Sequence, residues 1–494
     1  MRDGIRFFRR GRLVEVRDFA PSTMLLDYLR EVEGARGSKE GCGDGGCGAC
    51  TVAIGRLRNG ALVYEPVNAC IQLLGMIDGA EVLTVEDLAD DDGSLHPVQT
   101  ALVTRNAIQC GFCAPGFAMS LFTLFHDREQ SVTRELVEGW IAGNLCRCTG
   151  YRSIVDAALD TCAGARSDRF SENAPETIGL LSILGDDDDL FVGNEDQFFA
   201  APVDLDAFAA LYAAHPDATI VAGATDVGPW VTKQLRDLDK VIHLGRIRGF
   251  DWIEETDEEL RFGGGTTFAQ AEPWLGTIDP DLAELVRRFG SKQIRARGTL
   301  AGNVAIGSPN ADLVPPLIAL DAAIELHKRG AVRSLPVERF LVDEERALAE
   351  GEFIAGLSVP KLRQDQLFRC YKVSKRLDQD VASVTAAFRF TIDESGHIAE
   401  ARLAFGGLAP TARRAPSAEA ALRGTQLRDS RAWAAAFAAL RNDFEPSGDF
   451  RGSARYRSET AHALLGKALI ESAGTASSRT RVVGWREDEV RAVS

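Results

Sequence analysis

The stretch EGCGDGGCGAC, residues 40–50, constrains the fold more than any other part of the chain. It places three cysteines among five glycines. Glycine loses more backbone entropy on folding than any other residue, so this segment favours neither helix nor strand. A loop that concentrates thiols without regular structure points to a bound group that the thiols surround, and the next cysteine along the chain is Cys70.

The spacing of these four thiols indicates which group they hold. Cys42-x4-Cys47-x2-Cys50, followed by Cys70, is the arrangement of a plant-type ferredoxin loop around a [2Fe–2S] cluster. Glycine permits the positive φ angles that turn backbone N–H groups toward the sulfurs. Two alternatives stay open from the spacing alone, a zinc site and a set of reactive or inert thiols.

A second set of thiols lies in QCGFCAPGF and GNLCRCTGY, as Cys110-x2-Cys113 and Cys146-x-Cys148. Each pair stands beside a segment with helical periodicity, so two helix ends can present four thiolates to one site. We predict a second [2Fe–2S] cluster there, although paired thiols of this kind also suit zinc. In a reducing compartment such clustering indicates metal rather than disulfides.

Composition excludes several classes of function. The chain of 494 residues carries a formal net charge of −16, so it has no basic excess for binding nucleic acid or an anionic membrane. It contains no apolar run of about 18 residues, and its start has no signal-peptide core. We therefore expect a cytoplasmic protein with no membrane partner.

Periodicity changes several times along the chain. Residues 1 to about 85 read as strands, in RLVEV, CTVAIG and ALVYEPV, with a short helix in MLLDYLREV. Residues from about 95 to 163 read as helices. After a polar break containing the acidic run GDDDDL, which we interpret as a solvated linker, the chain becomes mixed α/β from about residue 198. From about 368 two strands precede Ala-rich helices, and the polar tail is expected to fray.

Two segments of the α/β part suit a flavin nucleotide. TIVAGATDVG is a strand followed by a glycine turn, where Gly223 and Ala224 leave backbone N–H groups open to a pyrophosphate. Alone, this segment also reads as an ordinary strand-to-helix turn. GTLAGNVAIGSPNAD supplies small and polar groups, Thr299, Gly302 and Asn303 among them, that suit phosphate oxygens and ribose hydroxyls.

These motifs together resemble a known family. EGCGDGGCGACTV, QCGFCAPGF, NLCRCTGYRSI and QIRARGTLAGNVAIGSPNADLVPPLIAL are similar to the iron–sulfur and flavin portions of the xanthine dehydrogenase family of molybdenum hydroxylases. The resemblance covers residues 1 to about 470, and it is specifically to the small subunit of bacterial members. It implies a multidomain α+β fold: a β-grasp ferredoxin-like [2Fe–2S] domain (1–85), an all-helical [2Fe–2S] domain (86–165), a linker (166–197), an α+β FAD-binding domain of the vanillyl-alcohol-oxidase/CO-dehydrogenase-flavoprotein type (198–365), a C-terminal α+β domain (366–475) and a tail (476–494).

The resemblance also implies site residues. The metal ligands are Cys42, Cys47, Cys50, Cys70, Cys110, Cys113, Cys146 and Cys148. The FAD contacts are Ile220, Val221, Ala222, Gly223, Ala224, Thr225, Asp226, Val227, Thr299, Leu300, Ala301, Gly302, Asn303 and Asp312, with Phe289, Ile354 and Lys372 near the flavin ring. Asp378 and Asp380 fall where NAD approaches in the family. No side chain of this chain is expected to be a catalytic acid, base or nucleophile.

The function implied is electron transfer during oxidation of hypoxanthine and xanthine to urate. Electrons would leave a molybdenum centre on a molybdopterin-binding large subunit, cross the two clusters to FAD, and reduce NAD. The two chains would form a heterotetramer. The alternatives are a related molybdenum hydroxylase acting on an aldehyde or another N-heterocycle, a stand-alone NAD(P)H-dependent reductase, and a zinc-stabilised scaffold with a degenerate flavin fold.

Overall fold

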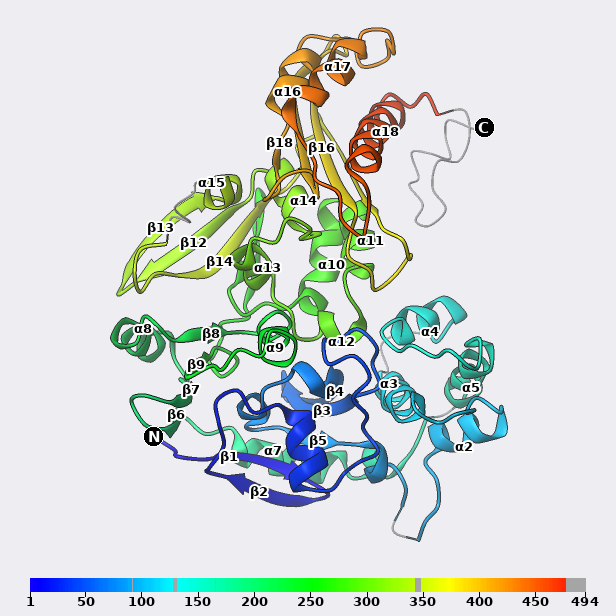
Figure 1. Cartoon of the computed structure of the whole chain (residues 1–494), viewed down its shortest axis with the longest axis vertical. Helices are drawn as coiled ribbons and strands as arrows, with labels where there is room; N and C mark the ends of the chain where they lie inside the picture. Colours follow the sequence, from blue (N-terminus) through cyan, green and yellow to red (C-terminus); the bar gives the residue numbers. More distant parts are fainter. Residues whose placement is uncertain (91, 128–130, 165, 343–347, 477–494) are drawn as a thin grey trace. The chain divides into compact units, whose positions relative to one another are not determined.

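The computed structural model describes residues 1–90, 92–127, 131–164, 166–342 and 348–476. The chain divides into two compact units (Figure 1). Unit 1 comprises residues 1–248 together with 290–298, and unit 2 comprises residues 249–289 and the chain from 299 onward. Each unit has its own sheets and its own hydrophobic clusters. The predicted frayed tail at 477–494 lies outside the described residues.

Unit 1 begins with a five-stranded sheet in the order β2-β1-β5-β3-β4, in which β1 and β5 are parallel and the other neighbours antiparallel. The strands are β1 (Ile5–Arg9), β2 (Arg12–Val16), β3 (Thr51–Arg58), β4 (Ala61–Asn68) and β5 (Glu81–Leu83). Short helical turns connect them: α1 (Leu25–Asp27), η1 (Tyr28–Val32), η2 (Ala69–Ile71), η3 (Leu74–Ile77) and η4 (Val85–Asp87). The strands and the short helix predicted for this region are confirmed.

Four helices follow, and they form the predicted all-helical region: α2 (Pro97–Thr104), α3 (Ala114–His126), α4 (Arg134–Ile141) and α5 (Arg152–Cys162). Pro115 lies in the first turn of α3, where its missing N–H breaks no helical hydrogen bond. The apolar faces of these helices share one hydrophobic cluster with Ala53, Tyr64 and Leu83 of the preceding sheet. The helical region therefore packs directly on the ferredoxin-like sheet.

The acidic run at 185–190 is solvated only in part, because Asp187 and Asp188 are 78% and 59% exposed while Asp186 is held by arginines. It follows two helices, α6 (Arg169–Glu172) and α7 (Ala174–Leu184). Asp186 pairs with Arg2, Arg6 and Arg246, and its side chain is only 20% exposed. The prediction missed the pairing of Asp186 because its arginines lie far away in sequence, so the local window shows only the negative charges.

The rest of unit 1 contains a four-stranded sheet in the order β6-β7-β9-β8. Its elements are β6 (Leu190–Gly193), β7 (Phe198–Ala201), α8 (Leu205–Ala214), β8 (Thr219–Val221), α9 (Val227–Thr232), β9 (Lys240–His243) and α12 (Lys292–Arg295). Phe199, Val221 and Val241 belong to the same hydrophobic cluster as Phe7 and Val52 of the ferredoxin-like sheet. The two parts therefore bury apolar surface together, although a polar break separates them in sequence.

Unit 2 holds a five-stranded sheet in the order β10-β11-β14-β12-β13, antiparallel throughout. Its strands are β10 (Ile253–Glu255), β11 (Glu259–Gly263), β12 (Ala323–Lys328), β13 (Ala331–Pro336) and β14 (Phe353–Pro360). Its helices are α10 (Phe268–Ile278), α11 (Pro280–Arg287), α13 (Leu300–Ile306), α14 (Val314–Ala319) and α15 (Val337–Val342).

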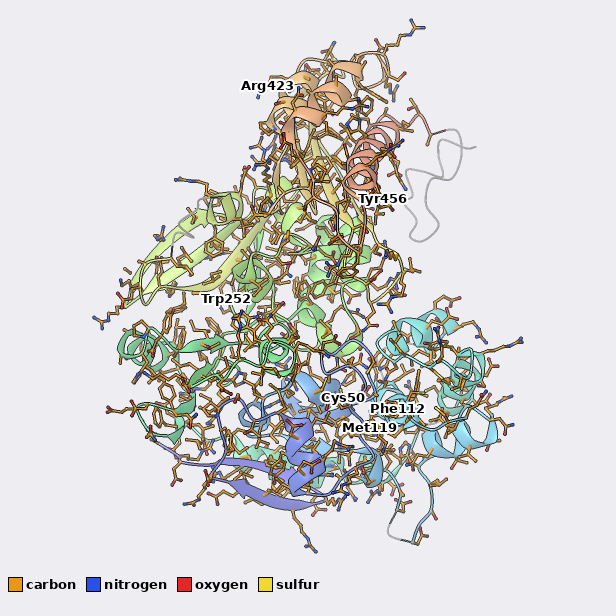
Figure 2. All side chains as sticks on the ribbon, viewed as in Figure 1. Cys50, Phe112, Met119, Trp252, Arg423 and Tyr456 are labelled. Atoms are coloured by element: carbon orange, nitrogen blue, oxygen red, sulfur yellow. The ribbon has the colours of Figure 1, made fainter. Side chains whose placement is uncertain are left out.

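The C-terminal part of unit 2 is a second antiparallel sheet, ordered β15-β16-β17-β18. The elements are β15 (Gln366–Val373), β16 (Val384–Ile392), β17 (Ile398–Gly406), β18 (Arg413–Arg414), α16 (Pro416–Leu422), α17 (Ala434–Asp443) and α18 (Ala454–Ser472). Helix α18 packs along β15 and β16, as Figure 1 shows, and Figure 2 labels Tyr456 near its start. The predicted succession of strands and Ala-rich helices is confirmed.

Candidate cofactor sites

The first cysteine loop curls around one sulfur. The backbone N–H groups of Asp44, Gly46 and Cys47 point to the Sγ of Cys42 at 3.5, 3.2 and 3.3 Å. The loop reaches this shape through glycines with positive φ, among them Gly45 at +75°. Such angles are strained for residues with a side chain, so the glycine content predicted from the sequence has a direct backbone cause.

The other three thiols of this set converge on the same point. Contacts with Cys47 and Cys70 lower the pKa of Cys42, and the same contacts raise the pKa of those two partners. Cys50 and Cys70 are buried, and Figure 2 labels Cys50 among the side chains of the ferredoxin-like domain. A low-pKa sulfur ringed by thiols and inward N–H groups fits the four-thiolate ligand set of a [2Fe–2S] cluster.

The second set of thiols is built from helix ends. Cys113 precedes the first turn of α3, and its partner Cys146 comes from the loop before α5. Burial, and then the contact with Cys146, raises the pKa of Cys113 to about 12, while a contact with Cys110 raises the pKa of Cys148. The structure therefore brings all four predicted ligands together, with Cys110 and Cys148 exposed to solvent.

Sequence reasoning missed the residues that hold the second loop in shape. The backbone N–H and the hydroxyl of Thr149 donate to the Sγ of Cys146 at 3.4 and 3.2 Å. The hydroxyl of Tyr151 accepts from the backbone N–H of Cys146 at 2.8 Å. Tyr151 has φ of 68°, a left-handed value that is uncommon for a residue with a side chain. No local pattern signalled this conformation.

The two thiol sets meet at a close backbone junction. The backbone N–H of Leu145 donates to the carbonyl oxygen of Cys47 at 2.9 Å. The side-chain amide of Asn144 donates to the carbonyl oxygen of Gly48 at 3.1 Å. A Cβ on Gly116 would overlap that same carbonyl oxygen, so only glycine fits there. One hydrogen bond therefore joins a ligand of the first set to the neighbour of a ligand of the second.

Unit 1 contains the first of the two predicted flavin segments, 220–227. It leaves the end of β8 and turns sharply at Ala224, whose φ is 60°. Gly223 lies against the carbonyl of Arg297, and a Cβ there would overlap that oxygen. The segment is thus a tight backbone turn with small residues, as a phosphate-binding turn requires.

Unit 2 contains the remaining predicted flavin residues. The hydroxyl of Thr299 caps α13 by accepting from the backbone N–H of Gly302 at 3.0 Å. Among the described residues, the buried amide oxygens of Asn303 and Asn310 have no hydrogen-bond partner within the protein. Buried acceptors of this kind are normally satisfied, so they mark where a polar ligand group fits.

Lys372 and Asp312, predicted separately, form one buried ion pair. The Nζ of Lys372 lies 2.6 Å from the Oδ2 of Asp312 and donates to the carbonyl of Arg288 at 2.9 Å. Burial raises the pKa of Asp312 although the lysine opposes that shift. Phe289 stacks on Phe268 with ring centroids 4.0 Å apart and is half-buried.

Ile354 lies in the hydrophobic core of unit 2 and is 9% exposed. Asp378 pairs with Arg287, and Asp380 accepts from the backbone N–H of Arg376. The flavin role of each of these residues, and the cluster role of each cysteine, stays a prediction.

Four protein families match consecutive segments of the sequence. They are the 2Fe-2S iron-sulfur cluster binding domain at residues 7–71, the [2Fe-2S] binding domain at 84–159, the FAD binding domain in molybdopterin dehydrogenase at 195–362, and the CO dehydrogenase flavoprotein C-terminal domain at 369–472. The predicted order of two iron–sulfur domains, an FAD-binding domain and a C-terminal domain is therefore confirmed. The buried acceptors and the convergent thiols fit these cofactors.

Two relatives and one solved structure extend the comparison. Xanthine dehydrogenase of Emericella nidulans is 30% identical over 519 residues, which cover 93% of this chain and 38% of that protein. Aldehyde oxidase of Homo sapiens is 28% identical over 461 residues, covering 82% of this chain and 34% of that protein. This chain therefore spans little more than a third of the length of these relatives.

The solved structure is carbon monoxide dehydrogenase from Hydrogenophaga pseudoflava, in a form that lacks the Mo-pyranopterin moiety of its cofactor. It is 28% identical, with a TM-score of 0.51, over 55% of this chain and 95% of the solved chain. Among the described residues, none of the helices has the length and apolar character needed to cross a membrane.

Proposed function

The chain belongs to the molybdenum hydroxylase family of xanthine dehydrogenase and carbon monoxide dehydrogenase, and we propose that it is the electron-transfer subunit of a xanthine dehydrogenase. In this proposal substrate is oxidised on a separate molybdopterin-binding subunit. The electrons cross this chain through the helical-domain cluster, then the ferredoxin-like cluster, and then FAD to NAD. Two such pairs form a heterotetramer in the cytoplasm.

The observation that carries the proposal is the junction between the two thiol sets. The hydrogen bond from Leu145 to the carbonyl of Cys47 gives a short, rigid connection between two four-cysteine sites. Exposure supports the direction of flow, because Cys110 and Cys148 face solvent whereas Cys50 and Cys70 are buried. The site with two exposed ligands is accessible to a partner subunit, whereas the first site has no fully exposed ligand.

The residues of this chain set the electrostatics of each site. The three N–H groups that point to Cys42 favour negative charge on its sulfur, which reduction of the site increases. When bound, FAD supplies the conversion between single-electron transfer and hydride transfer to NAD. The buried oxygens of Asn303 and Asn310 would accept hydrogen bonds from such a ligand, beside the N-terminus of α13 that Thr299 caps.

The substrate is assigned from the relatives. Xanthine dehydrogenases of Emericella nidulans and Drosophila subobscura are among the similar proteins, which supports xanthine as the substrate. The similarity to aldehyde oxidase supports an aldehyde as the competing substrate class.

The test is to purify the chain alone and together with its co-produced partner. The chain alone is expected to pass electrons from NADH to an artificial dye, and to show no xanthine-dependent reduction of NAD. The complex is expected to show both activities, and an aldehyde panel separates the two substrate classes. Xanthine hydroxylation by the chain alone would contradict the division of labour, and a colourless zinc protein would reject every redox function.

A further inference from the structure

Gln293 is flanked in sequence by segments of unit 2, but its side chain is buried in unit 1. It lies on α12, in the segment 290–298 between two stretches of unit 2, yet this segment packs within unit 1. There α12 contacts β4 of the ferredoxin-like sheet and α4 of the helical domain. Gln293 is 1% exposed. A glutamine buried this deeply needs a specific set of partners.

Its partners are the polar groups at the junction of the two iron–sulfur domains. The Nε2 of Gln293 has three acceptors within hydrogen-bond distance for its two N–H groups: the Oγ of Ser120, the Oγ1 of Thr51 and the Oδ1 of Asn144, at 3.3, 3.2 and 3.1 Å. All three acceptor residues are 2% exposed or less. Thr51 starts β3 in the ferredoxin-like domain, while Ser120 and Asn144 belong to the helical domain.

The orientation of the amide follows from the donors already in use. The hydroxyl of Thr51 donates to the carbonyl of Gly48 at 2.6 Å, and the hydroxyl of Ser120 donates to Asn144 at 2.8 Å. The amide of Asn144 donates to Gly48 and to Thr51. The oxygens of these three side chains can still accept hydrogen bonds, but none of the three has a further donor to offer. The NH2 group of Gln293 supplies the missing donor. Its amide oxygen has no hydrogen-bond partner among the described residues.

The network surrounds the connection between the thiol sets. Thr51 follows Cys50 directly, and Asn144 and Leu145 precede Cys146. The hydrogen bond from Leu145 to the carbonyl of Cys47 lies within the same junction. A shift of Asn144 relative to Thr51 therefore changes the separation of the two cluster sites, and electron tunnelling falls exponentially with separation.

We propose that Gln293 is a positioning residue that fixes the separation of the two [2Fe–2S] clusters by supplying the donor that clamps the two domains together. The proposal deepens the electron-transfer function and rests on it. Gln293 does not contact a cluster itself; it acts through Thr51 and Asn144. Electron transfer between the clusters makes and breaks no bonds. Gln293 therefore affects only the distance between the clusters and takes no part in a chemical step.

The test replaces Gln293 by glutamate in the full chain with both clusters bound. Gln293→Glu keeps the size of the side chain but removes the donors and faces three acceptors with a carboxylate. We expect iron content and the separate EPR signal of each reduced cluster to persist. We expect the magnetic coupling between the clusters to weaken, and electron equilibration between them after mixing with NADH to slow by roughly tenfold, since small misplacements have large kinetic effects.

Gln99→Glu is the matched control. Gln99 accepts from the backbone N–H of His96 and donates to the carbonyl of Val85, and neither partner belongs to the junction, so the same chemical change should leave coupling and rate at wild-type values. Unchanged coupling and rate in Gln293→Glu would overturn the proposal, as would an equal loss in Gln99→Glu.

If Gln293→Glu fails to retain its clusters, the variant Ser120→Ala tests the positioning role of the network instead. It removes one acceptor of the network without adding charge, and a smaller loss of coupling in the same direction is expected, whereas wild-type coupling would overturn the proposal. The proposed electron-transfer function and the positioning role of Gln293 are contradicted by different results. A wild-type chain with only one cluster signal rejects the proposed function, while two coupled clusters that ignore Gln293 reject only the positioning role.

Discussion

The two thiol sets both offer four cysteine ligands, but different backbone structures hold the ligands in place. In the first set the backbone curls around Cys42, three N–H groups point at its sulfur, and two ligands are buried in a hydrophobic cluster. In the second set two helix ends present the thiols, and Cys110 and Cys148 are exposed. The first site therefore has two ligands in a hydrophobic cluster and none fully exposed, whereas the second has one ligand, Cys146, in a hydrophobic cluster and two exposed to solvent.

The largest expected difference follows from removing one ligand of each set. We expect Cys50→Ser and Cys148→Ser each to lower iron from about four to about two per chain. Cys50→Ser should also lower the melting temperature strongly, because metal binding and core formation are coupled there. Iron analysis and thermal unfolding check this. Equal melting temperatures in the two variants would break the comparison.

A smaller but still large effect is expected from two glycines that both have positive φ. Gly48 has φ of +68°, and a Cβ there would overlap the carbonyl oxygen of Gly143; Gly111 has φ of +86° with open space around it. We expect Gly48→Ala to destabilise the chain by about 3 to 5 kcal/mol and Gly111→Ala by about 1 to 2 kcal/mol. Urea unfolding followed by cluster absorption measures both, and similar costs would contradict the tighter packing of the first loop.

The helical domain is anchored away from its cluster by Asp168. The Oδ2 of this carboxylate accepts from the Nε2 of His96 at 2.6 Å and of His126 at 2.9 Å. Burial by itself raises the pKa of Asp168, but the hydrogen bonds from His126 and His96 together outweigh burial and lower the pKa below the usual 3.8. A carboxyl group whose pKa is lower in the folded state stabilises the fold at any pH above its unfolded-state pKa. This stability is lost as the pH falls from the unfolded-state pKa to the folded-state pKa.

We therefore expect acid to destabilise the helical domain before the ferredoxin-like domain. Asp168→Asn should cost about 2 kcal/mol at neutral pH and flatten the loss below about pH 4. Thermal loss of the second cluster signal as a function of pH tests this, with the first cluster signal as the internal control. A steep acid dependence that persists in Asp168→Asn would contradict the role of this carboxylate.

The smallest effect is expected at the surface beside the second set. Ile108 is 41% exposed, so Ile108→Ser should change the stability of the chain by no more than about 0.5 kcal/mol and leave its iron unchanged. Under the proposed function the same change should weaken binding to the partner subunit, measured by co-purification. A large loss of stability or iron would show that this face belongs to the core of the domain.

The sequence by itself determined the features whose causes are local. Cysteine spacing and glycine content specify how one loop wraps around thiols, because the atoms involved are only a few residues apart. The strands near the N-terminus and helices α3 to α5 followed from periodicity and from the position of Pro115 for the same reason. The family motifs extended this to the order of the domains.

Only the tertiary structure decided the relations between distant residues. Within the acidic run, Asp186 pairs with the distant Arg2 and Arg246, and the flavin segment at 220–227 shares its hydrophobic cluster with the ferredoxin-like sheet. Gln293 opens the motif QIRARGTL, but the motif does not show its role, because that role depends on acceptors that its own neighbourhood in sequence does not contain. Packing creates such partners, since burying a polar group requires hydrogen bonds from whichever segment the fold brings close.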